Sequence, residues 1–169
     1  MRTVVTVLPD ILKPNLKVVF CGTAVGTRSA EVGACYAGSG NQFWDVLWRT
    51  HLTRGERLKP EDFPRLPEFG IGLTDLVKVR SGPDNSINTS DYDVAGFLSK
   101  IKQFTPKILA FNGKRAACAF YGRKRVDYGR QSEPLGRTAV FVLPSTSGAA
   151  RRYWKESHWR GLAKCASGS

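Results

Sequence analysis

The stretch 18–44, VVFCGTAVGTRSAEVGACYAGSGNQFW, decides the fold. It opens with the apolar run Val18-Val19-Phe20 and breaks at Cys21-Gly22 into a loop with several glycines. A buried strand that ends in a glycine-rich loop is where α/β proteins bind ligands, because glycine lets the bare backbone approach them closely. The stretch therefore predicts a binding loop on a rigid α/β frame.

Apolar runs alternate with amphipathic segments along the rest of the chain. Strands are expected at 17–20, 107–111 and 138–143. Helices are predicted at 41–52, 114–121 and 151–164. A further helix is predicted to begin at a capping box formed by Ser90 and Asp93 and to end at Pro106. The pattern of residues 69–79 predicts an irregular extended stretch that could form a pocket wall, and loops are expected at 54–68, 81–90 and 126–135. Residues 1–7 form either an edge strand or a docked arm.

Strands that alternate with helices pair in parallel through right-handed crossovers. The sequence thus predicts one α/β domain over residues 1–169, a three-layer helix–sheet–helix sandwich with a central, mainly parallel sheet. Ligands bind beyond the carboxyl ends of such strands. Three loops leave those ends, at 22–41, 112–113 and 145–152, and the first and third would face one cleft.

The charge indicates a polyanionic partner. The chain has 26 Lys and Arg against 14 Asp and Glu, a net charge of +12. Residues 114–164 alone contain twelve basic and three acidic residues. This concentration favours nucleic acid as the partner, although a basic surface without a partner remains the alternative.

Cysteine and histidine spacing indicates no metal site and no disulfide framework. The four cysteines are scattered, at Cys21, Cys35, Cys118 and Cys165, and neither His51 nor His158 lies at a ligand spacing. There is no secretory apolar region and no apolar run near eighteen residues. We therefore expect a cytoplasmic protein without a membrane partner.

Five motifs in order carry a resemblance to a known family: DILKPNLKVVFCG (10–22), YAGSGNQFW (36–44), GIGLTDLV (70–77), ILAFNGK (108–114) and VLPSTSGAARRYW (142–154). Over about residues 10–164 the chain resembles the uracil-DNA glycosylase superfamily, and most nearly its mismatch-specific uracil/thymine-DNA glycosylase branch. The resemblance implies a monomeric base-excision repair enzyme that flips uracil out of DNA and hydrolyses its N-glycosidic bond without a cofactor. No lysine is placed as a Schiff-base nucleophile, so monofunctional chemistry is expected.

The family's first motif, which is residues 22–26 (GTAVG) in this chain, departs from that branch. The family has Asn or Asp where this chain has Ala24, and alanine cannot orient the attacking water. Either another group does so, or the chain is a catalytically weak or inactive relative that binds lesions or single-stranded DNA. The candidates are Thr74 for water placement, Glu31 as an electrostatic stabiliser, and Asn41.

The resemblance also assigns binding roles. Tyr36 would stack on the flipped base, with packing in the core as the alternative role of this ring. The backbone of Thr23, Ala24 and Val25 would meet the edge of the base, with help from the Asn41 amide. If it does not bind the base, Asn41 only caps the following helix. The family's second motif, which is residues 145–152 in this chain, would enter the minor groove. The DNA-binding residues in this motif and in the first loop would be Arg28, Ser145, Thr146, Ser147, Gly148, Arg151 and Arg152.

Specificity is expected to be broad. Ala24 leaves space for hypoxanthine or xanthine besides uracil, and no reader of the opposite base stands out, so single strands are plausible substrates alongside duplexes. A nucleotide-dependent enzyme is disfavoured because GTAVGT at 22–27 lacks the P-loop pattern. An RNA-binding module is disfavoured because aromatic-rich strand motifs are missing.

Overall fold

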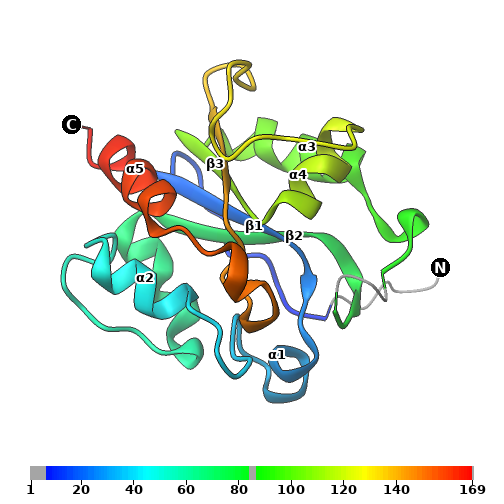
Figure 1. Cartoon of the computed structure of the whole chain (residues 1–169). Coiled ribbons are helices and arrows are strands. Elements are labelled where there is room, and N and C mark those ends of the chain that lie inside the picture. The colour runs from blue at the N-terminus through cyan, green and yellow to red at the C-terminus, as the bar shows by residue number, and fades with distance from the viewer. Residues whose placement is uncertain (1–6, 84–86, 169) are drawn as a thin grey trace.

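A five-stranded sheet in the order β2-β1-β3-β5-β4 forms the centre of the protein (Figure 1). The computed structural model describes residues 7–83 and 87–168. The strands are β1 (Val18–Val25), β2 (Ile71–Ser81), β3 (Ile108–Asn112), β4 (Gly129–Arg130) and β5 (Ala139–Leu143). All pairs are parallel except that of β4 with β5, so the predicted mainly parallel sheet is confirmed.

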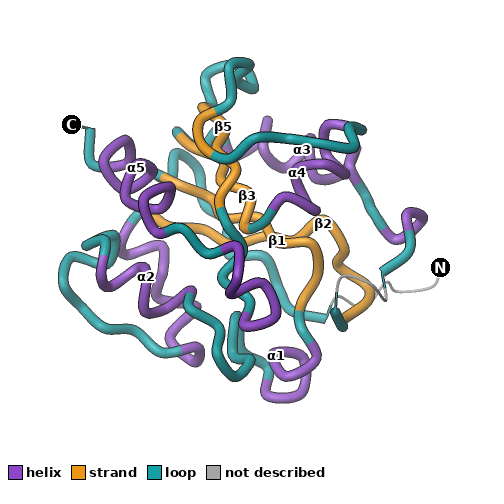
Figure 2. The backbone as a smooth tube through the Cα atoms, in the orientation of Figure 1, coloured by secondary structure: helices purple, strands orange, loops and turns teal. Residues whose placement is uncertain are grey.

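Helices cover both faces of the sheet (Figures 1 and 2). Side chains of α2 (Phe43–Arg49) and α5 (Glu156–Ala166) pack on one face, and those of α3 (Val94–Phe104) and α4 (Lys114–Tyr121) on the other. The predicted three-layer α/β sandwich is therefore confirmed. The remaining helices are α1 (Thr27–Val32) and the 3₁₀ helices η1 (Pro60–Phe69), η3 (Thr89–Asp91) and η4 (Gly148–Tyr153).

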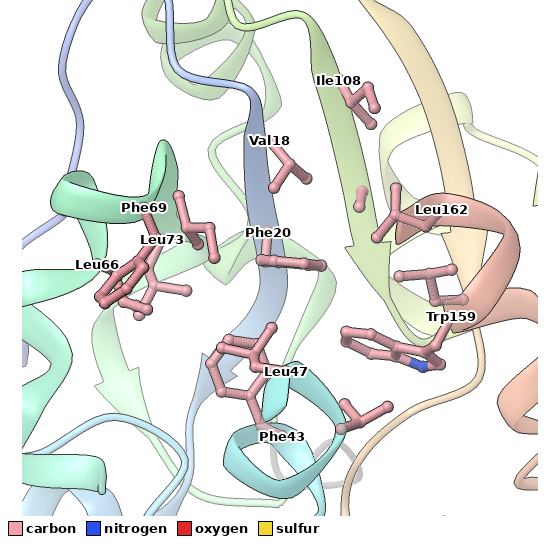
Figure 3. Packing of buried hydrophobic residues seen from close by; sticks show 14 of the residues in the cluster. Val18, Phe20, Phe43, Leu47, Leu66, Phe69, Leu73, Ile108, Trp159 and Leu162 are labelled. Carbon is pink, nitrogen blue, oxygen red and sulfur yellow. The ribbon is translucent and has the colours of Figure 1, made fainter. Parts of the chain in front are cut away.

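An aromatic cluster fixes the two helices on the first face. The Phe20 ring on β1 lies 5.5 Å edge-on from Phe43 of α2 and is stacked 5.3 Å from Trp159 of α5 (Figure 3). The Trp159 Nε1 donates a hydrogen bond to the Pro144 carbonyl, at 3.0 Å. These contacts are fully buried and hold the loop after β5 against α5.

The structure corrects two sequence expectations near the expected cleft. β1 does not break at Cys21-Gly22 but runs on to Val25, because its pairing with β2 continues to Val25 although its pairing with β3 ends at Cys21. Residues 69–79 are not irregular, since Ile71 begins an eleven-residue strand beside β1. Helix α1 also lies inside the expected loop. Both strands were mispredicted because glycine has a low strand propensity. Glycine is nevertheless found in strands where another backbone approaches closely.

Several predicted boundaries are wrong. Helix α3 follows Asp93, whose Oδ1 accepts a hydrogen bond from the Gly96 N–H at 2.9 Å, so Asp93 and not Ser90 is the cap. The C-terminal α-helix begins at Glu156 rather than at 151, because the preceding residues form η4. The helix predicted at 41–52 spans only Phe43–Arg49, and the loop predicted at 126–135 contains β4.

The N-terminal segment runs along the outer edge of the sheet. Residues 1–6 of the predicted strand or arm lie outside the described residues. Val7 donates a backbone hydrogen bond to the Lys78 carbonyl, and Ile11 pairs with Leu73 of β2 in an antiparallel bridge. The edge of β2 is thus covered from Val7 to Ile11. Among the described residues, no helix is long and apolar enough to cross a bilayer.

Replacing Gly72 tests the contact between the N-terminal segment and β2. A Cβ at this position would lie 2.6 Å from the Ile11 carbonyl oxygen and 2.7 Å from Leu16 Cδ1. We expect Gly72→Ala to lower the free energy of unfolding by about 1–3 kcal/mol. The control Gly161→Ala on α5 adds its methyl to open space and should raise it by roughly 0.5–1 kcal/mol. Denaturant unfolding of both variants measures the difference, and equal stabilities would contradict this packing.

Candidate active site

A cavity of about 690 Å³ lies beyond the carboxyl ends of β3 and β5, against the second half of β1 and residues 73–75 of β2. The loops after β1, β3 and β5 all reach it, as the topology predicts. Most predicted site residues line it, namely Thr23, Ala24, Val25, Arg28, Tyr36, Asn41, Thr74, Ser145, Thr146, Ser147 and Gly148. Glu31, Arg151 and Arg152 do not.

The aromatic ring of Tyr36 stacks on a core phenylalanine. Its centroid lies 4.1 Å from that of Phe43, at an interplanar angle of 25°. Tyr36 has a φ of +52°, which turns the chain between α1 and α2. The preceding Cys35 carbonyl accepts a hydrogen bond from Trp44 Nε1 at 3.0 Å. Burial raises the pKa of the Tyr36 hydroxyl well above its usual range, so this side chain is a neutral ring fixed by packing.

Asn41 lies both at the start of α2 and at the cavity. Its Oδ1 accepts a hydrogen bond from the Phe43 N–H at 3.0 Å, and the residue is among those that line the cavity. The neighbouring Gln42 N–H donates to the Thr146 carbonyl at 2.9 Å. The first loop is thereby joined to the loop after β5.

Asn112 is a site residue that sequence reasoning missed. Its Nδ2 donates to Thr146 Oγ1 at 2.9 Å, and its Oδ1 accepts from the Thr146 N–H at 3.0 Å. This buried reciprocal pair fixes the end of β3 against the second motif. The signal was a polar residue at the end of an apolar strand, which the sequence reading treated only as part of a turn.

Thr74 is buried beside a partly buried charged cluster at the edge of β2. Its hydroxyl donates to Asp10 Oδ1 at 2.9 Å, and the ammonium groups of Lys78 and Lys100 lie 2.9 and 2.6 Å from the same carboxylate. Burial by itself would raise the pKa of Asp10, but the two lysines and Thr74 outweigh it and the pKa is lowered. The Thr74 hydroxyl is therefore already bound to an ionised carboxylate.

Asp75 is the acidic residue among the described cavity walls. Adjacent strand residues point to opposite faces, so its side chain lies on the other face from Thr74. Its Oδ1 lies 2.7 Å from the point that a Cβ on Gly22 would occupy, and the Tyr36 hydroxyl lies 3.3 Å from that point. Burial raises the pKa of Asp75 to about 6, although the Lys78 ammonium, 3.8 Å from Oδ2, opposes the shift.

The exposed candidates lie around the rim. Glu31 is 60% exposed and pairs with Arg28 at 3.7 Å, facing solvent rather than the cavity. Arg151 and Arg152 are exposed on η4, and the Arg152 guanidinium lies 4.7 Å from the ring centroid of Tyr153. Tyr153 is 54% exposed and lines the cavity, and the sequence reading did not single it out.

The second motif lies directly against the first loop. A Cβ on Gly148 would be 3.1 Å from the Ser39 carbonyl oxygen, so glycine permits this close approach. Ser147 caps η4 through a hydrogen bond from the Ala149 N–H, at 3.3 Å. In the part of the chain that the structure describes, no group of three or more His, Cys, Asp or Glu side chains could hold a metal ion.

Two comparisons place the chain among known proteins. Residues 9–163 match the sequence model of the uracil DNA glycosylase superfamily. The fold is similar to the solution NMR structure of a candidate uracil DNA glycosylase from Methanosarcina acetivorans, with a TM-score of 0.62. The two sequences are 24% identical, and the similarity covers 95% of this chain and 96% of that one. This likeness concerns the fold.

Substituting Asp75 should show that its charge destabilises the protein. The folded state keeps this proton up to about pH 6, whereas an ordinary Asp releases it near 3.8. The folded state therefore loses stability relative to the unfolded chain as the pH rises from about 4 to 7. Asp75→Asn should be more stable than the wild type by roughly 2–3 kcal/mol at pH 8 and little different at pH 4.

Thermal unfolding of the variant and the wild type at pH 4 and pH 8 measures the difference in stability between the two proteins. Asp127→Asn removes an exposed carboxylate and serves as the control, with the same small difference from wild type at pH 4 and pH 8. A less stable Asp75→Asn at pH 8 would contradict the buried, destabilised charge.

Proposed function

Because the chain belongs to the uracil DNA glycosylase superfamily, we propose that it is a monofunctional DNA glycosylase of base-excision repair. It flips uracil out of DNA and hydrolyses the N-glycosidic bond, leaving an abasic site. One observation carries the proposal: the cavity at the carboxyl ends of the parallel strands brings Tyr36, Asn41 and the second motif to one place. The mismatch-specific branch is the nearest assignment by motif.

The flipped base would stack on Tyr36. Phe43 supports one side of the Tyr36 ring, so the ring is rigid before the base arrives. The backbone of residues 23–25 lies along the same cavity and supplies N–H and C=O groups for the edge of the base. Since Ala24 adds only a methyl group here, we propose that hypoxanthine and xanthine also fit.

Water placement falls best to Asn41. The Asn41 amide still has its N–H groups after Oδ1 has accepted the helix hydrogen bond. Thr74 comes second, because its hydroxyl donates to Asp10 and can only accept from water. Glu31 comes last, since its ion pair with Arg28 lies at the exposed rim. A fixed amide near the sugar would orient water while the cationic sugar forms.

DNA would contact the rim formed by the second motif. Ser145, Ser147 and Gly148 would offer hydroxyl and backbone groups to phosphates, whereas Thr146 is buried and would hold the motif in place through Asn112. Arg151 or Arg152 on η4 would fill the space left by the base. These contacts need only one strand, so we propose activity on single- and double-stranded DNA by a monomer that forms one domain.

Monofunctional chemistry fits the position of Lys114, the lysine among the described cavity walls. Its ammonium lies 4.2 Å from the ring centroid of Tyr128. A Schiff base requires a lysine amine that is free to attack the sugar, whereas the Lys114 side chain is held against the Tyr128 ring. We therefore propose a hydrolytic reaction that leaves the DNA strand intact.

Excision of uracil from a labelled oligonucleotide tests the function. In EDTA, the wild type should produce abasic sites in single strands and in U·G and U·A duplexes, and strand scission should appear only after alkali. Tyr36→Ala should lower the rate about 5- to 150-fold, because stacking on an aromatic ring is worth about 1–3 kcal/mol per base. Tyr36→Phe keeps the ring and should retain most of the activity. Tight binding of DNA without any abasic product would instead indicate a lesion-binding relative.

The salt dependence of DNA binding tests whether η4 lies against the DNA. Replacing both Arg151 and Arg152 by Gln removes two positive charges beside the DNA, so it should reduce the slope of log K against log[salt] by up to about 1.8, since each neutralised phosphate contributes about 0.9. Arg65→Gln removes a charge from η1, before the amino end of β2, and should leave the slope unchanged. Fluorescence anisotropy with a labelled duplex measures the slopes, and equal slopes in all three proteins would place the DNA elsewhere.

A further inference from the structure

The cavity contains a carboxyl group that this scheme does not use. Asp75 reaches into it across β1 because residue 22 is glycine, and any side chain there would lie 2.7 Å from its Oδ1. The Tyr36 hydroxyl lies close to the same point. The Asp75 carboxylate, the Tyr36 hydroxyl and the bare backbone of Gly22 thus meet at one place on the wall.

Burial along β1 shows how deep this place is. Gly22 is buried, Ala24 is half-buried and Gly26 is exposed, so β1 rises from the floor of the cavity to its mouth. Two residues of a strand span about 6.6 Å. The DNA backbone must stay at the mouth, beside the second motif, which places the sugar nearer to Ala24 and the base at the depth of Gly22. Asp75 therefore faces the far edge of the base and not the sugar.

We propose that Asp75 in its neutral form donates a hydrogen bond to the carbonyl at the far edge of the flipped base, and stabilises the negative charge that this carbonyl gains as the base leaves. The inference rests on the proposed function. The edge opposite the glycosidic nitrogen carries C4=O in uracil and C6=O in hypoxanthine. These are the carbonyls that deamination leaves in place of the amino groups of cytosine and adenine.

The reaction balances without proton transfer from Asp75. The bond between C1′ and the base nitrogen breaks, and its electron pair moves into the ring and its carbonyl oxygens. The oxygen of water adds to C1′, one proton of that water passes to solvent, and the departed base later takes up a proton. A neutral carboxyl donor strengthens its hydrogen bond as charge builds up on the base, whereas a carboxylate would repel the base anion.

The surroundings of Asp75 favour the neutral form. Burial raises its pKa to about 6, and the nearby Asp10 carboxylate acts in the same direction. Lys78 on β2 and Lys100 on α3 act against it, but both are also bound to Asp10. The other titratable groups near it on β1 and in the first loop are Cys21, Cys35 and Tyr36. They stay uncharged because burial raises their pKa values.

The pH dependence of excision from a single-stranded uracil oligonucleotide tests the proposal. The wild-type kcat/KM, which reports the free enzyme, should fall about tenfold per pH unit above pH 6. Asp75→Asn keeps a neutral donor, so it should lose this pH dependence and exceed the wild type at pH 8. Asp75→Ala should be about 10²- to 10³-fold slower than the wild type at pH 5.5. Glu61→Gln, an exposed change on η1, should follow the wild-type profile.

A substrate without the acceptor gives a second readout. An oligonucleotide containing 2-pyrimidinone has no carbonyl at the far edge, so Asp75→Ala should slow its excision only a few-fold. Circular dichroism of each variant checks that it is folded.

Three results would overturn the role of Asp75 while leaving the glycosylase intact: Asp75→Asn as slow as Asp75→Ala, a wild-type rate that rises through pH 6, or an equal effect of Asp75→Ala on both substrates. A wild type that excises uracil at no pH would overturn the proposed function itself.

Discussion

The packing of Phe20 between Phe43 and Trp159 is the contact on which the site depends. It fixes α2 and α5 on the same face of β1. Phe43 in turn supports the Tyr36 ring, and Trp159 holds the Pro144 carbonyl just before the second motif. The buried core therefore extends directly into the cavity wall, and both loops around the cavity are positioned by helices that pack on one strand.

Glycine makes the rest of the arrangement possible. Gly22 lets the Asp75 carboxyl approach β1, and Gly148 lets the second motif lie against the Ser39 carbonyl. A buried carboxyl without a close salt bridge costs stability, and the nearest described cation is 3.8 Å away. Proteins keep such groups mainly where function needs them, so this cost points to the cavity as the working part of the molecule.

The sequence predicted correctly those elements whose ends are marked by proline or by an Asn-Gly turn. β3, α4 and β5 begin and end close to the expected residues, because Pro106, the Asn112-Gly113 turn and Pro144 mark their ends. β2 was misread because Gly70 and Gly72 argue against a strand there. Gly70 instead ends η1, and Gly72 lies where the Ile11 carbonyl and Leu16 approach it closely. Asp75 falls in the stretch predicted as a possible pocket wall, but no chemical role was predicted for it. Once β2 is read as a strand, alternation places Asp75 on the same face as Leu73, toward the cavity.

The central claim is that this cavity receives an extrahelical base, and an NMR titration with free uracil tests it most directly. Amide shifts of ¹⁵N-labelled protein should change, in a saturable way, at residues 22–25, Tyr36 and Asn112. No change there at saturating uracil would contradict the account, as would changes confined to the groove between α5 and the Phe69 end of η1.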